Sequence, residues 1–195
     1  MEMRFKTGCI EIMFFTLTVI WTLTGSAAPV LGEPFPTFGT GPIKVRIYTD
    51  YFCPPCRGME PQLEPVLEDL LNRNVITLTL VDTPFYRYSA LYARYFLYAL
   101  NGKNSYNQAF RVRTVLNEAA ENRHFTTKER LEEIFKAKDI PWREFDPKSI
   151  LDRYNALIKE DHIDAKPSCV IIRTGRKDKY VGDQDIVKAL KVLQP

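Results

Sequence analysis

The sequence is poor in the residues on which metal sites and disulfide frameworks depend. Its 195 residues include four cysteines and two histidines. Structural zinc usually takes four ligands, but the chain has no second cysteine pair, and His124 and His162 are isolated. Cys9 lies in a segment that we expect to be removed, so one close pair and one single cysteine remain. This count argues against a disulfide-stapled framework and favours a redox pair over a metal site.

Strong charge, repeats and low-complexity segments are missing as well. The formal net charge is only +3, and no basic run is interleaved with exposed aromatics, so we do not expect nucleic-acid binding. Hydrophobic residues make up 45% and charged residues 26% of the chain, which is typical of a globular domain. This length is sufficient for one well-cored domain with an insertion.

The N-terminal residues 1–28 have the three-part pattern of a secretory signal peptide. Arg4 and Lys6 give a basic start, residues 12–23 are apolar, and small residues precede a cleavage site near Ala27 or Ala28. The apolar core is shorter than the ~20 residues that a spanning helix needs, although an uncleaved membrane anchor is the alternative. Either interpretation places the folded part in an exported compartment such as a periplasm, where disulfides persist.

The rest of the chain predicts an α/β layout. Residues 29–42, rich in proline and glycine, are typical of a linker. Residues 43–83 read as strand, helix and strand, residues 84–161 as four helices, and residues 162–195 as two short strands and a helix. We therefore expect a helical insertion between the second and third strands.

The pair Cys53-Pro54-Pro55-Cys56 lies where the first strand passes into the first helix. Thiols at this spacing can join as a disulfide, and the free N–H groups and dipole of a helix start favour a thiolate at Cys53. Pro54 and Pro55 are tolerated there, because first-turn N–H groups have no partner within the helix. Between a strand and a helix, this spacing is a thioredoxin-like redox motif.

The segment from Asp50 to Cys56 resembles the active site of the DsbA-like branch of the thioredoxin superfamily. Pro61 is similar to the helix-kinking proline of thioredoxins, and residues 165–169 resemble the cis-proline loop, with Pro167 as the cis residue. The resemblance covers roughly residues 43–193. It implies a thioredoxin-like α/β fold with a helical insertion and a protein disulfide oxidoreductase.

The resemblance also implies roles for individual residues. Cys53 would attack or be attacked, and Cys56 would resolve the mixed disulfide. No cofactor is implied beyond the Cys53–Cys56 disulfide. The supporting or substrate-binding residues would be Phe52, Pro54, Pro55, Lys166 and Pro167. Phe52 and Pro167 would shape an apolar groove, and the backbone of Lys166 would be offered to the substrate.

Three positions differ from the family pattern. Ile47 stands where the family often buries an acid, and we expect the nearer Asp50 to point elsewhere. Pro55 offers the thiolate no N–H, which predicts a less oxidising pair than that of DsbA. Lys166 precedes the cis-proline; its ammonium either approaches Cys53 and favours the thiolate or extends to solvent.

The most favoured function is an exported oxidase of protein thiols. The alternatives are a periplasmic reductase, for example in cytochrome maturation, and a non-catalytic copper-binding module. The expected partners are protein thiol or disulfide substrates and a membrane redox protein, either a quinone-linked oxidase or a transmembrane reductase.

Cys169 is expected to be a core residue, with an extra resolving thiol as the alternative. The stripe formed by Tyr88, Tyr92, Tyr95 and Phe96 favours core packing over a substrate groove.

Overall fold

A computed structural model describes residues 1–2, 35–122 and 127–194 of the chain. The predicted signal peptide, apart from residues 1–2, and residues 29–34 of the predicted linker lie outside this description. The compact unit, residues 32–195, is described here by itself. None of the helices in the described parts has the length and apolar character needed to cross a membrane.

The unit is built on a five-stranded mixed sheet with the strand order β1-β3-β2-β4-β5. The strands are β1 (Thr37–Phe38), β2 (Ile43–Thr49), β3 (Ile76–Asp82), β4 (Ser168–Arg173) and β5 (Arg176–Val181). β2 and β3 are parallel, whereas the other neighbouring pairs are antiparallel. The three inner strands bury most of their residues, and the partly exposed or exposed positions of β2 and β3 lie among the first four residues of these strands.

The first strand corrects the prediction that residues 29–42 form only a linker. Thr37 and Phe38 pair with Thr79 and Leu78 at the edge of the sheet. A Cβ at Gly41 would lie 2.2 Å from the backbone of Val75 and Ile76, so this glycine permits a close approach of two backbones. The glycine-rich composition of residues 29–42 is therefore also used to pack an edge strand closely against β3.

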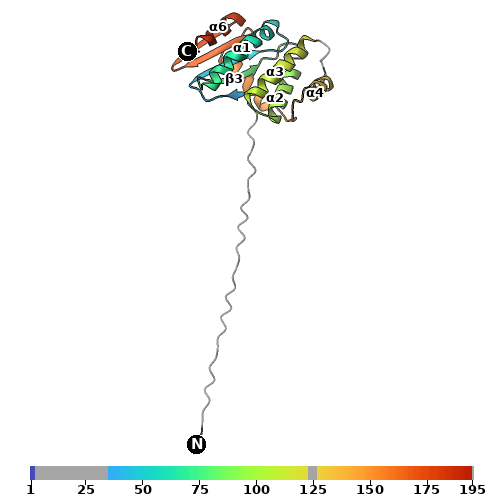
Figure 1. Ribbon diagram of the computed structural model, residues 1–195, viewed down its shortest axis with the longest axis vertical. Coiled ribbons are helices and arrows are strands. Elements are labelled where there is room, and N and C mark those ends of the chain that lie inside the picture. The colour runs from blue at the N-terminus through green and yellow to red at the C-terminus, as the bar shows by residue number, and fades with distance from the viewer. Residues whose placement is uncertain (3–34, 123–126, 195) are drawn as a thin grey trace. The chain divides into compact units, whose positions relative to one another are not determined.

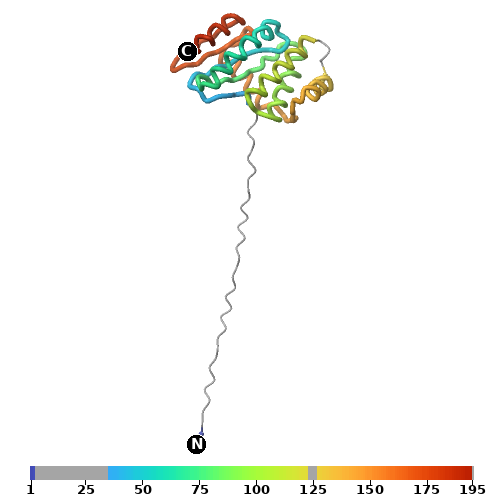
Figure 2. The backbone as a smooth tube through the Cα atoms, in the orientation of Figure 1, coloured from blue at the N-terminus to red at the C-terminus, as the bar shows by residue number. Residues whose placement is uncertain are grey.

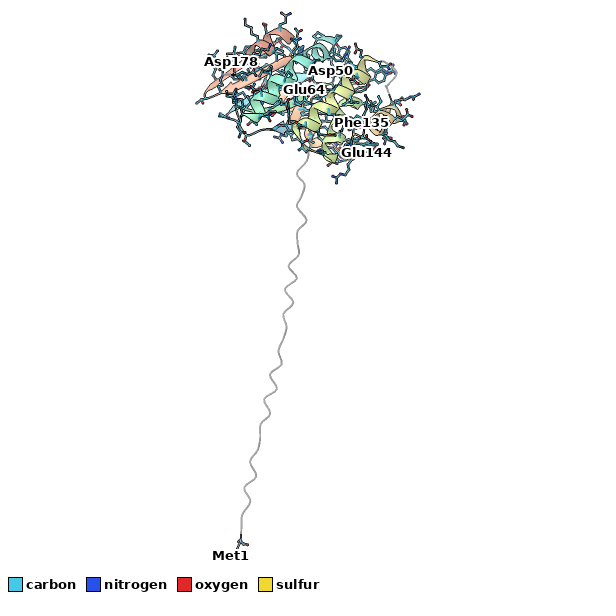
Figure 3. The ribbon with its side chains drawn as sticks, in the orientation of Figure 1. Met1, Asp50, Glu64, Phe135, Glu144 and Asp178 are labelled. Carbon is cyan, nitrogen blue, oxygen red and sulfur yellow. The ribbon has the colours of Figure 1, made fainter. Side chains whose placement is uncertain are left out.

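The described parts of the chain form six helices, and Figures 1 and 2 show how they accompany the sheet. They are α1 (Pro54–Asn72), α2 (Ser89–Gly102), α3 (Tyr106–Glu121), α4 (Lys128–Ala137), α5 (Lys148–Glu160) and α6 (Asp183–Lys191). α1 and α6 pack side by side against the sheet, and α2 packs on α3. The four helices between β3 and β4 form the predicted insertion. Phe135 of α4 lies in it, far from Asp178 of β5 (Figure 3).

Helix α1 carries the cysteine pair at its first turn. Cys53 is its N-cap residue in an extended conformation, and the carbonyl of Cys53 accepts the first helical hydrogen bond from Arg57 N at 3.1 Å. Pro61 and Pro65 lie inside the helix, which nevertheless continues as one element from residue 54 to 72. Both prolines are exposed, so water can satisfy the carbonyls that lose a partner.

The aromatic stripe of α2 divides between two environments. Tyr92, Tyr95 and Phe96 are fully buried in the core, as the helical spacing predicts. Tyr88, which precedes the helix, is only half-buried and faces a surface groove. The core interpretation therefore applies to most of the stripe, and its first residue belongs to the groove.

Candidate active site

The two cysteines are free thiols buried at the start of α1. Cys53 is 4% exposed and Cys56 2% exposed. The turn before the helix is closed by a hydrogen bond from Cys53 N to the carbonyl of Asp50 at 3.1 Å. The turn and the helix start therefore hold both sulfurs at the end of a strand, with access limited to a small opening.

The pKa of the Cys56 thiol is well above its ordinary value. Burial is the main cause, and a hydrogen bond with the Cys53 thiol adds to it, while the backbone of Asp50 acts in the opposite direction. Cys56 therefore keeps its proton at neutral pH. A thiol in this state can donate a hydrogen bond to a Cys53 thiolate.

The loop before β4 lies against Cys53. The peptide bond between Lys166 and Pro167 is cis, and the Lys166 carbonyl is 3.9 Å from Cys53 Sγ, close enough to accept a weak hydrogen bond. Pro167 is buried, and its carbonyl accepts a hydrogen bond from Gly182 N at 3.0 Å. The antiparallel pairing of Tyr48 with Ser168 brings this loop to the end of β2 where the cysteines lie.

Asp50 is a fully buried carboxylate at the cysteine turn, not a side chain that points elsewhere. It accepts hydrogen bonds from Phe52 N at 2.9 Å, from Phe85 N at 2.9 Å and from Ser89 Oγ at 2.8 Å. Its Oδ2 also lies 3.6 Å from the ammonium of Lys166. One carboxylate therefore joins the cysteine turn, the segment that leads into α2 and the cis-proline loop.

The side chain of Lys166 takes neither of the two predicted orientations. It is only 17% exposed, and its ammonium pairs with Asp50. Nζ also lies 3.4 Å from the carbonyl of Thr83 and over the rings of Phe85 and Tyr86, at 4.4 and 5.4 Å from their centroids. The carboxylate, the Thr83 carbonyl and the two ring faces together replace the water that the ammonium leaves, which accounts for this inward orientation.

Ile47 is buried and apolar, and it pairs with Cys169 on β4.

A separate charged network lies at the ends of β2 and β3. Arg113 of α3 forms ion pairs with Glu60 and with Asp82, the latter at 3.3 Å, and donates to Thr49 Oγ1 at 2.7 Å. Burial raises the pKa of Asp82 to about 6, although the nearby Arg113 opposes this shift.

Cys169 has no exposed surface, and burial raises the pKa of its thiol. It therefore packs as a core residue, which is the first of the two predicted roles. A resolving thiol must reach a mixed disulfide as a thiolate, and this position offers neither access nor ionisation.

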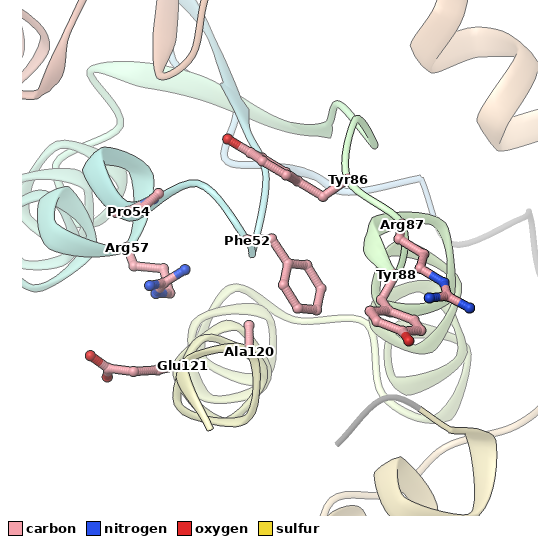
Figure 4. A pocket seen from close by; sticks show the side chains of 8 residues that line it. All are labelled: Phe52, Pro54, Arg57, Tyr86, Arg87, Tyr88, Ala120 and Glu121. Atoms are coloured by element: carbon pink, nitrogen blue, oxygen red, sulfur yellow. The ribbon is translucent and has the colours of Figure 1, made fainter. Parts of the chain in front are cut away.

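A groove of about 680 Å³ opens beside the cysteine pair (Figure 4). Its lining residues are Phe52, Pro54, Arg57, Tyr86, Arg87, Tyr88, Ala120 and Glu121. Phe52 and Pro54 are predicted site residues, and the exposed Pro55 lies next to them. Neither arginine was predicted from the sequence, although the alternation of aromatic and basic residues at 86–88 is a signal for Arg87.

Within the described parts of the chain, no group of three or more His, Cys, Asp or Glu side chains could hold a metal ion. His162 is exposed at the end of α5, with a φ of 50°. His124 lies outside the described residues.

The sequence matches no family model and no curated protein. Solved structures do match. A periplasmic thioredoxin-like protein from Salmonella enterica serovar Typhimurium has a TM-score of 0.61 and 19% identity over 85% of this chain and 94% of its own. Proteus mirabilis ScsC has a TM-score of 0.63 and 18% identity, and the match covers 83% of this chain and 71% of that structure. A single-residue variant of Wolbachia pipientis alpha-DsbA1 has a TM-score of 0.62 and 13% identity, and the match covers 86% of this chain and 92% of that structure. The predicted thioredoxin-like α/β fold with a helical insertion is therefore confirmed.

Proposed function

We propose that this chain is a thiol–disulfide oxidoreductase that exchanges disulfides with protein substrates through Cys53 and Cys56. The observation that supports it most directly is the placement of Cys53. Its sulfur lies at a helix N-terminus, three residues from a second thiol and 3.9 Å from the carbonyl of Lys166 in a cis-proline loop. A substrate segment that lies along this loop would present its sulfur to Cys53.

The exchange proceeds in two steps. In the oxidising direction, a substrate thiolate attacks Cys53 Sγ of the Cys53–Cys56 disulfide, and Cys56 leaves as a thiolate that takes up a proton. A second substrate thiolate then attacks the substrate sulfur of the mixed disulfide and releases Cys53. Two electrons pass from the substrate to the pair, and no cofactor beyond this disulfide is needed.

In the reducing direction, Cys56 must lose its proton before it attacks Cys53 in the mixed disulfide. The high pKa of Cys56 arises mainly from burial, and the hydrogen bond with Cys53 and the negative charge of Cys53 raise it further. This hydrogen bond and this charge are lost once the Cys53 sulfur is bonded to a substrate. The pKa of Cys56 then falls, so resolution becomes easier at the moment when it is required.

The proposed setting is a compartment outside the cytoplasm, to which residues 1–28 direct the chain before they are cleaved. The main direction of the exchange there is DsbA-like oxidation. Reoxidation would then require a quinone-linked membrane oxidase, whereas a reductase would require a transmembrane electron donor. Because Pro55 has no N–H to offer a thiolate, the pair should be a weaker oxidant than one with a complete set of donors. Periplasmic and DsbA-type structural relatives support this setting.

The test is a pair of assays, peptide oxidation with glutathione disulfide and insulin reduction, on the wild type and on cysteine variants. We expect Cys53→Ala to lower both rates to the uncatalysed level and Cys56→Ala to accumulate mixed disulfides. The matched control Cys169→Ala should remain active, because this thiol is enclosed in the core.

The equilibrium of the pair with glutathione would then give its reduction potential and hence its direction. Wild-type protein that accelerates neither reaction would contradict the proposal. Tight copper binding in the same sample would identify a binding module instead.

A further inference from the structure

The groove beside the cysteines is lined by the two residues that flank the nucleophile in the chain. Phe52 and Pro54 are the chain neighbours of Cys53, and both line the groove. An extended segment advances about 3.3 Å per residue. When a substrate cysteine is bonded to Cys53, the substrate residues within about three positions on one side therefore lie in the groove.

The floor of the groove is aromatic and fixed in place. The ring of Phe52 packs edge-on against the buried Tyr92 at 4.8 Å and lies 6.1 Å from the ring of Tyr88. The close view shows Phe52 at the centre of the groove, between α1, α3 and the segment that leads into α2 (Figure 4). Such a floor can accept the backbone and apolar side chains of many different segments, so it supplies contact area rather than selectivity.

The walls are cationic. Arg57 extends from α1 into the groove (Figure 4), and its Nη1 donates to the carbonyl of Tyr51 at 3.0 Å, which holds the guanidinium in place. Arg87 is exposed on the opposite wall, with its guanidinium 5.3 Å from the ring centre of Tyr88. Among residues 35–122 and 127–194, no carboxylate forms an ion pair with either arginine, whereas Arg46, Arg113 and Arg130 are all paired.

Two further features favour the binding of an anion between these walls. The positive ends of α1 and α2 lie at the same walls, because Pro54 begins α1 and Tyr88 immediately precedes α2. Of the described lining residues, only Glu121 is acidic; it lies on α3, and its carboxylate points away from Arg87 (Figure 4). Arg57 and Glu121 also line an adjoining groove together with Glu60, Glu64 and Glu118, so the acidic side chains gather on the Arg57 side and Arg87 is the cation farther from them.

We infer that this groove selects substrate segments that carry an aspartate or glutamate within about three residues of the reacting cysteine. The inference rests on the proposed function, because the groove is adjacent to the exchanging sulfur. A substrate carboxylate would pair with Arg87 or with Arg57, which lie on opposite sides of Phe52 (Figure 4), while a lysine at the same position would be repelled.

The experiment compares the oxidation of two dithiol peptides by the full protein, with glutathione disulfide as the terminal oxidant. The peptides are identical except that two aspartates or two lysines flank the first cysteine, and a second pair carries the charges on its other side. Each turnover transfers two electrons from the peptide to the Cys53–Cys56 disulfide, and glutathione disulfide then reoxidises the pair. We expect kcat/KM to favour the acidic peptide by about threefold to tenfold, mainly through KM, and less at high salt.

Arg87→Glu should reverse this preference, whereas Arg130→Glu should leave it unchanged. Arg130 is a matched control, since it is an exposed arginine on α4 and the charge change is the same. Equal rates for acidic and basic peptides would overturn the inference and leave the proposed function standing. An equal effect of both variants would overturn it too, because net charge would then explain the preference. Peptides oxidised no faster than by glutathione disulfide alone would overturn the proposed function and this inference with it.

Discussion

At the scale of single residues, the pair of Asp50 and Lys166 organises the site. Asp50 accepts hydrogen bonds from Phe85 and Ser89, which are 35 and 39 positions away in the sequence, and it forms an ion pair with Lys166. Lys166 reaches it from the cis-proline loop, which also contacts Cys53. The position of the loop relative to the nucleophile therefore depends on a buried charge pair, because breaking such a pair leaves an uncompensated charge.

This arrangement predicts coupling between the two residues. Asp50→Asn should lower the free energy of unfolding by about 2–4 kcal/mol, because it leaves a largely buried ammonium without its carboxylate. Lys166→Met in the same chain should recover part of this loss. A double-mutant cycle measured by urea unfolding should give a coupling energy of about 1 kcal/mol or more.

The control for the cycle is Asp50→Asn combined with Lys148→Met. Lys148 is exposed and pairs only with the exposed Asp152 among the described residues. That combination should be additive. Additivity of the Asp50 and Lys166 changes would instead show that the 3.6 Å contact contributes nothing to stability.

At the scale of elements, a second buried carboxylate ties the insertion to the sheet. Asp161 caps the end of α5 and accepts hydrogen bonds from Arg46 and Tyr48 of β2, and it pairs with Lys177 of β5 at 2.5 Å. Burial alone would raise the pKa of Asp161, but the hydrogen bonds from Lys177, Tyr48 and Arg46 outweigh it and lower the pKa below 3.8. A carboxylate at a helix C-terminus is unfavourable for the helix dipole, and the cations Arg46 and Lys177 compensate for it.

Asp161 and Asp82 therefore predict opposite effects of pH on stability. The folded pKa of Asp161 is lowered, so its contribution is fully present above pH 3.8 and is lost as the pH falls below that value. The folded pKa of Asp82 is raised from 3.8 to about 6, so its contribution to stability is largest below pH 3.8 and declines as the pH rises to about 6. The decline for Asp82 can reach about 3 kcal/mol, at about 1.36 kcal/mol per pKa unit.

Unfolding free energies of the wild type, Asp82→Asn and Asp161→Asn between about pH 3 and pH 7 test this pair of predictions. The wild type should lose stability relative to Asp82→Asn as the pH rises from about 4 to about 6. Relative to Asp161→Asn, it should lose stability only below about pH 4. Each variant is the control for the other, and parallel curves for both would refute the assignment.

At the scale of the whole molecule, the topology explains why the site assembles. β2 and β4 are antiparallel neighbours, so the end of one lies beside the start of the other. Cys53 follows β2 and Lys166 precedes β4, and these residues meet although 113 positions separate them. The helical insertion occupies the chain between β3 and β4 and contributes Tyr88 and Glu121 to the groove.

The chain as a whole is also predicted to be exported. When full-length protein is produced in a Gram-negative host, we expect intact-mass analysis of the periplasmic fraction to show a chain that begins after Ala27 or Ala28. Leu17→Arg, which interrupts the apolar run, should leave an uncleaved precursor inside the cell. Full-length wild-type protein in the membrane fraction would instead support an uncleaved anchor.

Local signals in the sequence predict the strand–helix placement of the cysteine pair, the helical insertion, the core face of α2 and the proline that precedes β4. Hydrophobic periodicity, turn residues and short spacings act over a few positions, so they can be recognised without the fold. The contacts of Asp50 with Lys166 and of Arg113 with Asp82, and the groove that Arg57 and Arg87 share, become visible only in the folded chain. Such contacts depend on strand register and helix packing between distant segments, and the charge of a single side chain does not specify which distant partner it will meet.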